Sequence, residues 1–217
     1  MTGLVRKATF LVACGVLVAS AAMASVPSPA NSTVPTCINL VGTNGTSADP
    51  AGAFTVTVKD LANVPINNSL VVLDLSACSG LQICTNQPGF TTDCATQTLR
   101  GFTGAGGTIT FNVIGHANTL CDAAPRNAYN CAKVYADGVL LGSPSAHAYD
   151  LNGGGVGPSD LSAWLCDFFG PNNPSRSDYN CTGTVDPADL SAWLVNFFGS
   201  GGAQGCIGGG TQCSVIP

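Results

Sequence analysis

The C-terminal part of the chain contains a repeated segment, because Asp160–Gly170 (DLSAWLCDFFG) recurs as Asp189–Gly199 (DLSAWLVNFFG). In each copy the apolar residues are spaced by three and four positions, which is typical of one face of an amphipathic helix. A helix of about three turns is too short to be stable alone in water. The repeat therefore predicts two short helices whose apolar faces pack on each other, with Gly170 and Gly199 as left-handed C-terminal caps.

Each predicted helix carries one tryptophan, Trp164 and Trp193, within its apolar face. A tryptophan at such a position is typical of a packed core. The alternative is that both rings are exposed and stack on carbohydrate. The helical spacing favours the core.

The segment before the second helix has the spacing of a twelve-residue calcium loop, whose oxygen ligands come from positions 1, 3, 5, 7, 9 and 12. The predicted ligands are Asp178, Asn180, Thr182, the Thr184 carbonyl, Asp186 and Asp189. Gly183 occupies position 6, where the chain turns sharply and a side chain would obstruct. Val185 follows at position 8 and is expected to anchor the loop in the hydrophobic core. We predict that this loop binds Ca²⁺.

A similar segment precedes the first helix but is one residue shorter. Its predicted ligands are Asp150, Asn152, Gly155 and Asp160, and Gly154 aligns with the turn position of the second loop. No carboxylate stands at position 5. Because fewer anionic ligands lower calcium affinity, we expect weaker binding here than in the second loop. The alternative is that the first loop is a turn that holds no metal.

The two loop–helix units between Asp150 and Gly199 resemble a type I dockerin, in which Asp rather than Glu ends each loop and a helix follows directly. The resemblance implies a small calcium-binding module over residues 148–200, whose partner is a cohesin-like or other surface receptor module. Cohesin-binding dockerins usually carry Ser-Thr at loop positions 10 and 11. Here those positions hold Pro158-Ser159 and Pro187-Ala188, so the chain departs from that recognition pattern.

Residues 25–147 have the pattern of a β domain. Phe54–Val58 and Ile109–Val113 alternate apolar and polar residues, as half-buried strands do, and Ser69–Leu75 is a denser apolar strand. Asp137-Gly138 is a hairpin dipeptide between two further strands. Short strands separated by Gly, Pro and Asn predict an antiparallel β-sandwich.

The segment Phe54–Leu73 (FTVTVKDLANVPINNSLVVL) resembles the strand–turn–strand signature of bacterial Ig-like group 1 domains, most specifically in the spacing of Asp60, Asn63 and Pro65. Gly106–Phe111 resembles a later strand of that family. Such domains are spacers and adhesive modules in invasin-type surface proteins. The resemblance implies an Ig-like sandwich, although the many cysteines of this chain depart from the family.

Residues 1–24 are predicted to be a cleaved signal peptide. Arg6 and Lys7 precede an apolar run, Ala8–Ala22, and Ala22-Met23-Ala24 is a small-residue cleavage site before Ser25. The run is short for a membrane span, so we expect no span after cleavage and a secreted, extracellular or cell-surface protein.

Cys14 gives the signal segment an alternative interpretation, because Leu11–Cys14 (LVAC) has the form of a lipidation site. The apolar run continues beyond it through Gly15–Val18, where a lipoprotein would already be mature. Cleavage near Ser25 is therefore favoured.

The chain has eleven cysteines, and loss of Cys14 would leave an even number. An even number of cysteines in an exported chain predicts disulfide bonds. Zinc is the alternative, but the chain has two histidines and no Cys-x2-Cys pair. We expect Cys166 and Cys181 to bridge the two repeats, and Cys206 and Cys213 to close a small loop in the Gly-rich tail, 201–217.

All twelve acidic residues are Asp, and only seven residues are Lys or Arg. A net negative, cation-poor chain argues against nucleic acid or an anionic membrane as partner. Without Glu, a Glu-containing glycosidase pair is excluded. His116 and His147 stand outside the hydrolase and metalloprotease motifs, and we interpret them as surface or turn residues. The sequence therefore favours a protein that is not an enzyme.

Two function classes follow. In the first, the chain is a non-catalytic attachment or assembly protein that docks its Ig-like domain on a scaffold or cell surface. In the alternative, calcium only stabilises the C-terminal module of a structural extracellular surface protein. An accessory protein of polysaccharide degradation is a third interpretation, which the sequence favours less.

Overall fold

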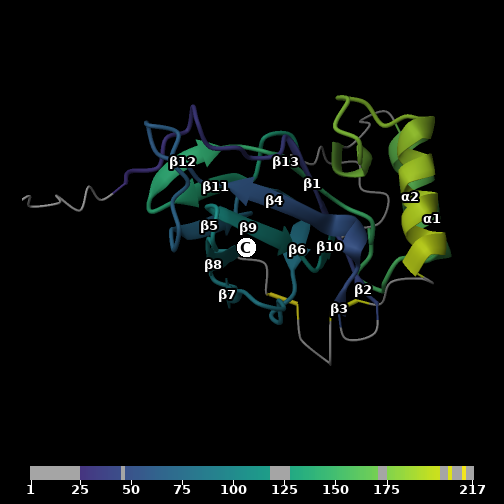
Figure 1. Ribbon diagram of the computed structural model, residues 1–217. Helices are drawn as coiled ribbons and strands as arrows, with labels where there is room; N and C mark the ends of the chain where they lie inside the picture. The colour runs from purple at the N-terminus through teal and green to yellow at the C-terminus, as the bar shows by residue number, and fades with distance from the viewer. Residues whose placement is uncertain are drawn as a thin grey trace, which may run out of the picture.

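The computed structural model describes residues 25–44, 47–117, 128–170, 175–200, 205–206 and 212–213. The predicted signal peptide (1–24), with Cys14, and most of the predicted tail (201–217) lie outside the described residues. The described chain is mainly β, with antiparallel sheets and two helices (Figure 1). The prediction of a β-rich chain whose last elements are two helices is confirmed.

The largest sheet has five antiparallel strands in the order β12-β11-β5-β8-β7. These strands are β5 (Leu70–Asp74), β7 (Thr91–Asp93), β8 (Thr98–Phe102), β11 (Lys133–Ala136) and β12 (Val139–Gly142). The predicted hairpin turn joins β11 to β12, and Asp137 and Gly138 both have positive φ. The Asp137 carboxylate accepts hydrogen bonds from the Ser69 hydroxyl at 2.7 Å and the Leu70 amide at 2.9 Å. These bonds fix the turn against the start of β5.

A second antiparallel pair, β4 (Ala53–Thr57) and β9 (Thr108–Asn112), lies across this sheet (Figure 1). In β9, Ile109 and Phe111 are buried and the residues between them are exposed, as the alternating sequence predicts. Gly101 of β8 shows how closely the strands approach. A β-carbon there would lie 2.7 Å from Cδ1 of Ile109, so the packing leaves no room for a side chain.

One pair of strands differs from the antiparallel prediction. The strands β1 (Cys37–Leu40) and β13 (Ser145–Ala148) run parallel. Parallel strands need a long crossover connection, and here the whole intervening β region forms it. Since β13 leads directly to Asp150, the pairing with β1 fixes where the first loop begins.

The remaining strands are short and antiparallel. They are β2 (Thr43–Asn44) with β3 (Ser47–Ala48), and β6 (Leu81–Ile83) with β10 (Gly115–Ala117). The 3-10 helices are η1 (Pro50–Gly52) and η2 (Ser175–Ser177).

The two predicted helices are α1 (Pro158–Phe169) and α2 (Pro187–Ser200). Each begins with proline, whose fixed φ and missing N–H suit the first helical position. The side chains of Asp160 and Asp189 accept hydrogen bonds from the backbone N–H groups of Gly157 and Asp186, at 2.7 and 2.8 Å. Neither helix of the described residues is long and apolar enough to cross a membrane.

The predicted left-handed caps at Gly170 and Gly199 are wrong. Gly170 has an extended conformation, with φ −70° and ψ 150°, and Gly199 lies inside α2. A side chain at Gly170 would collide with the carbonyl oxygen of Cys166. Glycine is therefore needed there for a close backbone approach and not for positive φ.

The helices and the strands share one hydrophobic core. Trp164 and Trp193 are buried, which confirms their predicted place in the core. The indole N–H of Trp193 donates a hydrogen bond of 3.2 Å to the carbonyl of Tyr149, directly after β13. Val185 is also buried, as predicted for an anchor of the second loop. The helical part is thus built onto the β region.

Disulfide bonds are confirmed, but two predicted pairings are wrong. Four pairs are described: Cys37–Cys181, Cys78–Cys131, Cys84–Cys206 and Cys94–Cys213. Cys181 bonds to Cys37 on β1, so it does not bridge to Cys166, which is itself disulfide-bonded. Cys206 and Cys213 do not close a loop, because they bond to Cys84 and Cys94 in the β region. Gln212 also forms a β-bridge with Cys84.

A buried ion pair joins α1 to η2. The Arg176 guanidinium donates to both carboxylate oxygens of Asp167, at 2.8 and 2.9 Å, and the Ser177 hydroxyl donates to the same group at 2.6 Å. Both charged side chains are almost wholly buried. At the equivalent position of α2, Asn196 donates to Asp49 at 3.2 Å. The repeat therefore places a buried polar anchor in each helix.

We expect Arg176→Met to lower the free energy of unfolding by about 3–5 kcal/mol, because Asp167 would be left as a buried, unpaired charge. Chemical denaturation of the oxidised protein measures this loss. Arg100→Met is the matched control, since Arg100 forms an exposed pair with Asp93 and should change stability by less than about 1 kcal/mol. Equal effects of the two substitutions would contradict the prediction.

Candidate metal centre

The second loop folds around the carboxylate of Asp178. One carboxylate oxygen accepts the backbone N–H of Thr182 at 3.0 Å, and the other accepts that of Gly183 at 2.8 Å. The Tyr129 hydroxyl donates to the latter oxygen at 3.1 Å. Asp178 is fully buried. The loop thus surrounds a buried carboxylate with backbone N–H groups.

Asp189 closes the same loop from the start of α2. Its carboxylate accepts the backbone N–H groups of Asn180 at 3.1 Å and Asp186 at 2.8 Å. It is also fully buried. Burial raises the pKa of Asp189, and the charges of Asp178 and Asp186 add to this, while the two N–H bonds lower it. The negative charges of Asp178 and Asp186 therefore act on the Asp189 carboxylate.

The remaining predicted ligands of the second loop lie near the surface. Asn180, Thr182 and Thr184 are exposed and Asp186 is half-buried. The Thr182 hydroxyl donates to the Thr184 carbonyl at 3.3 Å, so these two oxygens lie side by side. Gly183 has φ +98°, which confirms that the turn needs glycine.

The first loop repeats this arrangement with fewer side chains. The Asp150 carboxylate accepts the N–H groups of Asn152 at 3.0 Å, Gly153 at 2.7 Å and Gly155 at 2.8 Å. The Asp160 carboxylate accepts the N–H of Leu151 at 2.6 Å. Both aspartates are buried. In each repeat the loop-last carboxylate accepts a backbone N–H from a residue within two positions of the loop-first aspartate.

The first loop has glycines at four positions, one of which corresponds to an aspartate of the second loop. Gly153 and Gly155 have φ of +81° and +88°, so the sharp turn predicted at Gly154 is spread over its two neighbours. The Asn152 side-chain oxygen accepts the N–H of Gly154 at 2.7 Å. The second loop, by contrast, has Asp186 at the position where the first has Gly157. The first loop therefore offers two carboxylates and the second offers three.

Burial also raises the pKa of Asp160, to about 6, and the charge of Asp150 adds to this shift. Hydrogen bonds from Gly157 and Leu151 act in the opposite direction. A nearby cation stabilises the charged form of a buried carboxylate whose pKa is raised. Such pairs of buried carboxylates at the two ends of a loop provide the hard oxygen ligands that Ca²⁺ prefers.

The second loop offers the oxygen donors that calcium prefers, although Asp178, Asp186 and Asp189 do not all lie within 4.8 Å of one another. Each carboxylate oxygen has two lone pairs. Oδ1 of Asp178 and both oxygens of Asp189 each accept one backbone N–H and keep a lone pair for a metal, whereas the other oxygen of Asp178 accepts from both Gly183 and Tyr129. Asp178, Asn180, Thr182, Thr184, Asp186 and Asp189 would hold the ion. Calcium would neutralise the buried charges and supply no redox or acid–base chemistry.

The structure brings together a further group that the sequence did not predict. Among the described residues, only Cys37, His147 and Cys181 form a set of three metal-ligand side chains with all ligand atoms within 4.8 Å. Two of these sulfur atoms form a disulfide. His147 is wholly buried and His116 nearly so, and the prediction that they are surface or turn residues is wrong. No sequence signal links residues so far apart in the chain.

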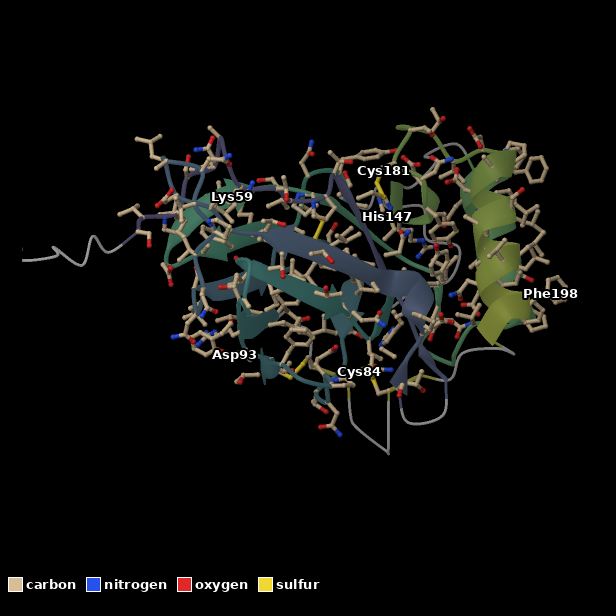
Figure 2. The ribbon with its side chains drawn as sticks, viewed as in Figure 1. Lys59, Cys84, Asp93, His147, Cys181 and Phe198 are labelled. Atoms are coloured by element: carbon tan, nitrogen blue, oxygen red, sulfur yellow. A yellow bond between two sulfur atoms is a disulfide. The ribbon has the colours of Figure 1, made fainter. Side chains whose placement is uncertain are left out.

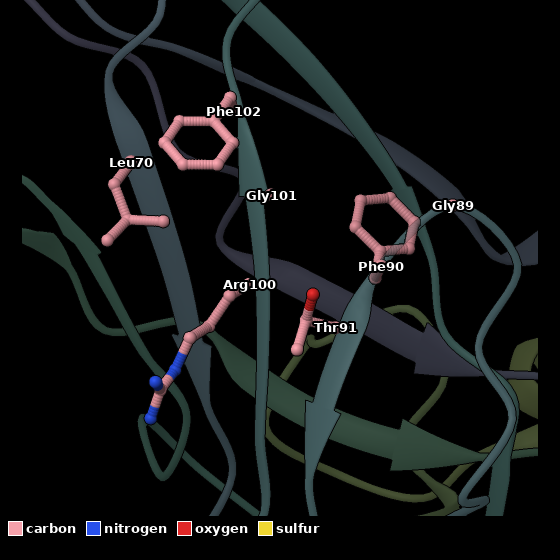
Figure 3. A pocket seen from close by; sticks show the side chains of 7 residues that line it. All are labelled: Leu70, Gly89, Phe90, Thr91, Arg100, Gly101 and Phe102. Atoms are coloured by element: carbon pink, nitrogen blue, oxygen red, sulfur yellow. The ribbon is translucent and has the colours of Figure 1, made fainter.

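A shallow groove of about 540 Å³ lies on the five-stranded sheet (Figure 3). Phe102 and Leu70 face each other across β8 and β5, and Phe90 lies on the other side of Gly101. The Phe102 ring is 61% exposed. Arg100 borders the groove and pairs with Asp93 at 3.4 Å. The groove offers an apolar surface beside one cation.

Compared with known proteins, the chain matches no family model, no curated protein and no solved structure.

We expect Asp189→Ala to lower calcium affinity more than Asp160→Ala. Asp189 closes a loop with three carboxylates, whereas Asp160 closes one with two, and calcium affinity rises with ligand charge. Titration calorimetry on the full-length oxidised variants measures both affinities. Thermal unfolding in calcium and in chelator serves as the control for folding. The reverse order would mean that the first loop is the tighter site.

Proposed function

We propose that this is a secreted, non-catalytic attachment or assembly protein. Its C-terminal part, residues 148–200, is a dockerin-like calcium-binding module, and residues 25–147 form an Ig-like β-sandwich. The calcium module docks the sandwich onto a receptor module of a scaffold or cell surface. Disulfide bonds in the described chain are compatible with this location.

The observation that carries the proposal is an exposed phenylalanine at the same position of each helix. Phe169 and Phe198 are 77% and 75% exposed. The Phe198 side chain points away from the sheets (Figure 2). Contiguous exposed apolar patches, rather than single exposed residues, mark surfaces that bind partners. That both copies of the repeat expose the ring favours a role in recognition.

Each exposed ring is supported by an identical aromatic stack. Trp164 stacks on Phe168, and Trp193 on Phe197, with ring centroids 5.1 Å apart in both helices. The exposed Phe169 and Phe198 then meet Phe168 and Phe197 edge to face. A ring held on half-buried neighbours loses little conformational entropy on binding.

Calcium would act on this surface through the helix starts. Asp160 and Asp189 lie in the first turns of α1 and α2 and also end the two loops. A bound ion would therefore fix the position of both helices. Docking should then depend on calcium.

The alternative is a structural surface protein in which calcium only stabilises the fold. The shared core and the Cys37–Cys181 disulfide favour this alternative, because they hold the loops to the β region by other means. The two candidates differ in whether exposed side chains bind a partner.

We expect the double variant Phe169→Ser/Phe198→Ser to lose calcium-dependent retention on surface fractions of the producing cells. The measurement is saturable binding of labelled full-length protein, with calcium and with chelator. Leu61→Ser is the matched control, since Leu61 is 84% exposed on the β region. The control should bind like the unmodified protein.

Two outcomes would contradict docking. Retention of the double variant equal to that of the control would show that the aromatic pair is not the contact. If the unmodified protein shows no saturable binding while chelator lowers its melting temperature, the structural alternative is supported.

The groove at Phe102 favours a second candidate, an accessory protein of polysaccharide degradation. An exposed aromatic ring on a sheet can stack on a sugar ring, and Arg100 can donate hydrogen bonds to it. We expect retention on insoluble polysaccharide that falls at least about tenfold in Phe102→Ala if this candidate holds. If Phe169→Ala lowers retention on polysaccharide as much as Phe102→Ala does, the groove is not the binding site.

A further inference from the structure

The Cys37–Cys181 disulfide differs from the other described disulfides in its exposure. Both of its cysteines are half-buried. Each of the other three bonds contains at least one buried cysteine, namely Cys78 with Cys131, Cys84, and Cys213. A thiol must reach a sulfur in order to exchange with it. On access alone, Cys37–Cys181 is the favoured target among the four.

A buried histidine lies against one sulfur of this bond. Nε2 of His147 is 3.0 Å from Sγ of Cys181, and Figure 2 shows the two side chains together between the strands and the helical part. His147 belongs to β13, where it pairs with Asn39 of β1, two residues from Cys37. Tyr129 meets the imidazole edge to face at 6.5 Å. The strand pairing therefore fixes the imidazole next to the disulfide.

The backbone around Cys181 also sets it apart. Cys181 has φ +56°, the left-handed region that residues with a β-carbon rarely adopt. It lies inside the second loop, between Asn180 and Thr182. The disulfide joins this residue to β1. Opening the bond would release a locally strained backbone.

We propose that Cys37–Cys181 is a site of thiol–disulfide exchange, which takes a thiol from a protein or a small molecule. The incoming thiolate sulfur forms a bond to Sγ of Cys37, and the Cys37–Cys181 bond breaks. Sγ of Cys181 leaves with the electron pair and accepts a hydrogen bond from the Nε2–H of His147. The proton of the incoming thiol has gone to water. The product is a mixed disulfide on Cys37 and a free Cys181, with no net change in oxidation.

The chemistry of the leaving sulfur sets this direction. Exchange is faster when the leaving sulfur is better stabilised as a thiolate, and a hydrogen-bond donor provides that stabilisation. Nε2 of His147 contacts Sγ of Cys181, so Cys181 is the sulfur that the imidazole can stabilise. Cys37 is therefore the sulfur that is attacked. This inference does not depend on calcium binding or docking.

The experiment exposes the oxidised full-length protein to reduced glutathione and, in a second arm, to reduced thioredoxin. Timed samples are alkylated and mapped by mass spectrometry. We expect Cys37–Cys181 to open at least about tenfold faster than Cys78–Cys131, with glutathione on Cys37 and the alkyl group on Cys181. Reaction in only one arm identifies the class of thiol that the site accepts. Equal rates for the two bonds, or glutathione on Cys181, would overturn the proposal.

Variants of His147 test the role of the imidazole. His147→Phe keeps a ring but removes the donor, and we expect opening to slow by about tenfold, the effect of one hydrogen bond. His147→Gln keeps an N–H donor and should restore part of the rate. His116→Phe is the matched control, because His116 is equally buried but lies on β10. If His147→Phe does not fold, the comparison of opening rates between the unmodified protein and His147→Gln still tests the role of the imidazole. Unchanged rates in folded His147→Phe would overturn the role of His147.

Discussion

A continuous hydrophobic core holds the two loops in place, because neither loop belongs to an independently packed unit. Trp193 reaches from α2 to the Tyr149 carbonyl, and Val185 packs from the second loop into the same core. The parallel pair β1–β13 delivers the chain to Asp150 from inside this core. Burial of the loop carboxylates follows from this placement. The raised pKa values of Asp160 and Asp189 follow in turn from that burial.

Local pattern predicted the elements that depend on neighbours in sequence. The alternation in β9, the turn at Asp137-Gly138 and the repeated spacing around Trp164 and Trp193 each correspond to an observed element or burial. The periodicities of strand and helix are properties of a few adjacent residues. The turn at Gly183 was predictable for the same reason, since one left-handed position needs a glycine.

Contacts between distant segments could not be predicted from the sequence. The pairing of β1 with β13 and the bond of Cys181 to Cys37 join residues whose separation carries no local signal. Ten cysteines allow far too many connectivities for parity to choose among them. The histidines were misjudged for the same reason, because burial of His147 results from the strand pairing and not from its neighbours. For the candidate site, the spacing predicted which aspartates stand at the two ends of each loop, but the surroundings of Cys181 could not be predicted.

The pairing of the last two described cysteines constrains the order of oxidative folding. Cys206 and Cys213 bond to Cys84 and Cys94 in the β region. These two β-region cysteines emerge early and lie close in sequence, so they are free to bond to each other before their partners are available. Such a bond would be a kinetic trap that only isomerisation could resolve. A protein with this connectivity would therefore depend on a disulfide isomerase, or on oxidation delayed until the chain is complete through residue 213.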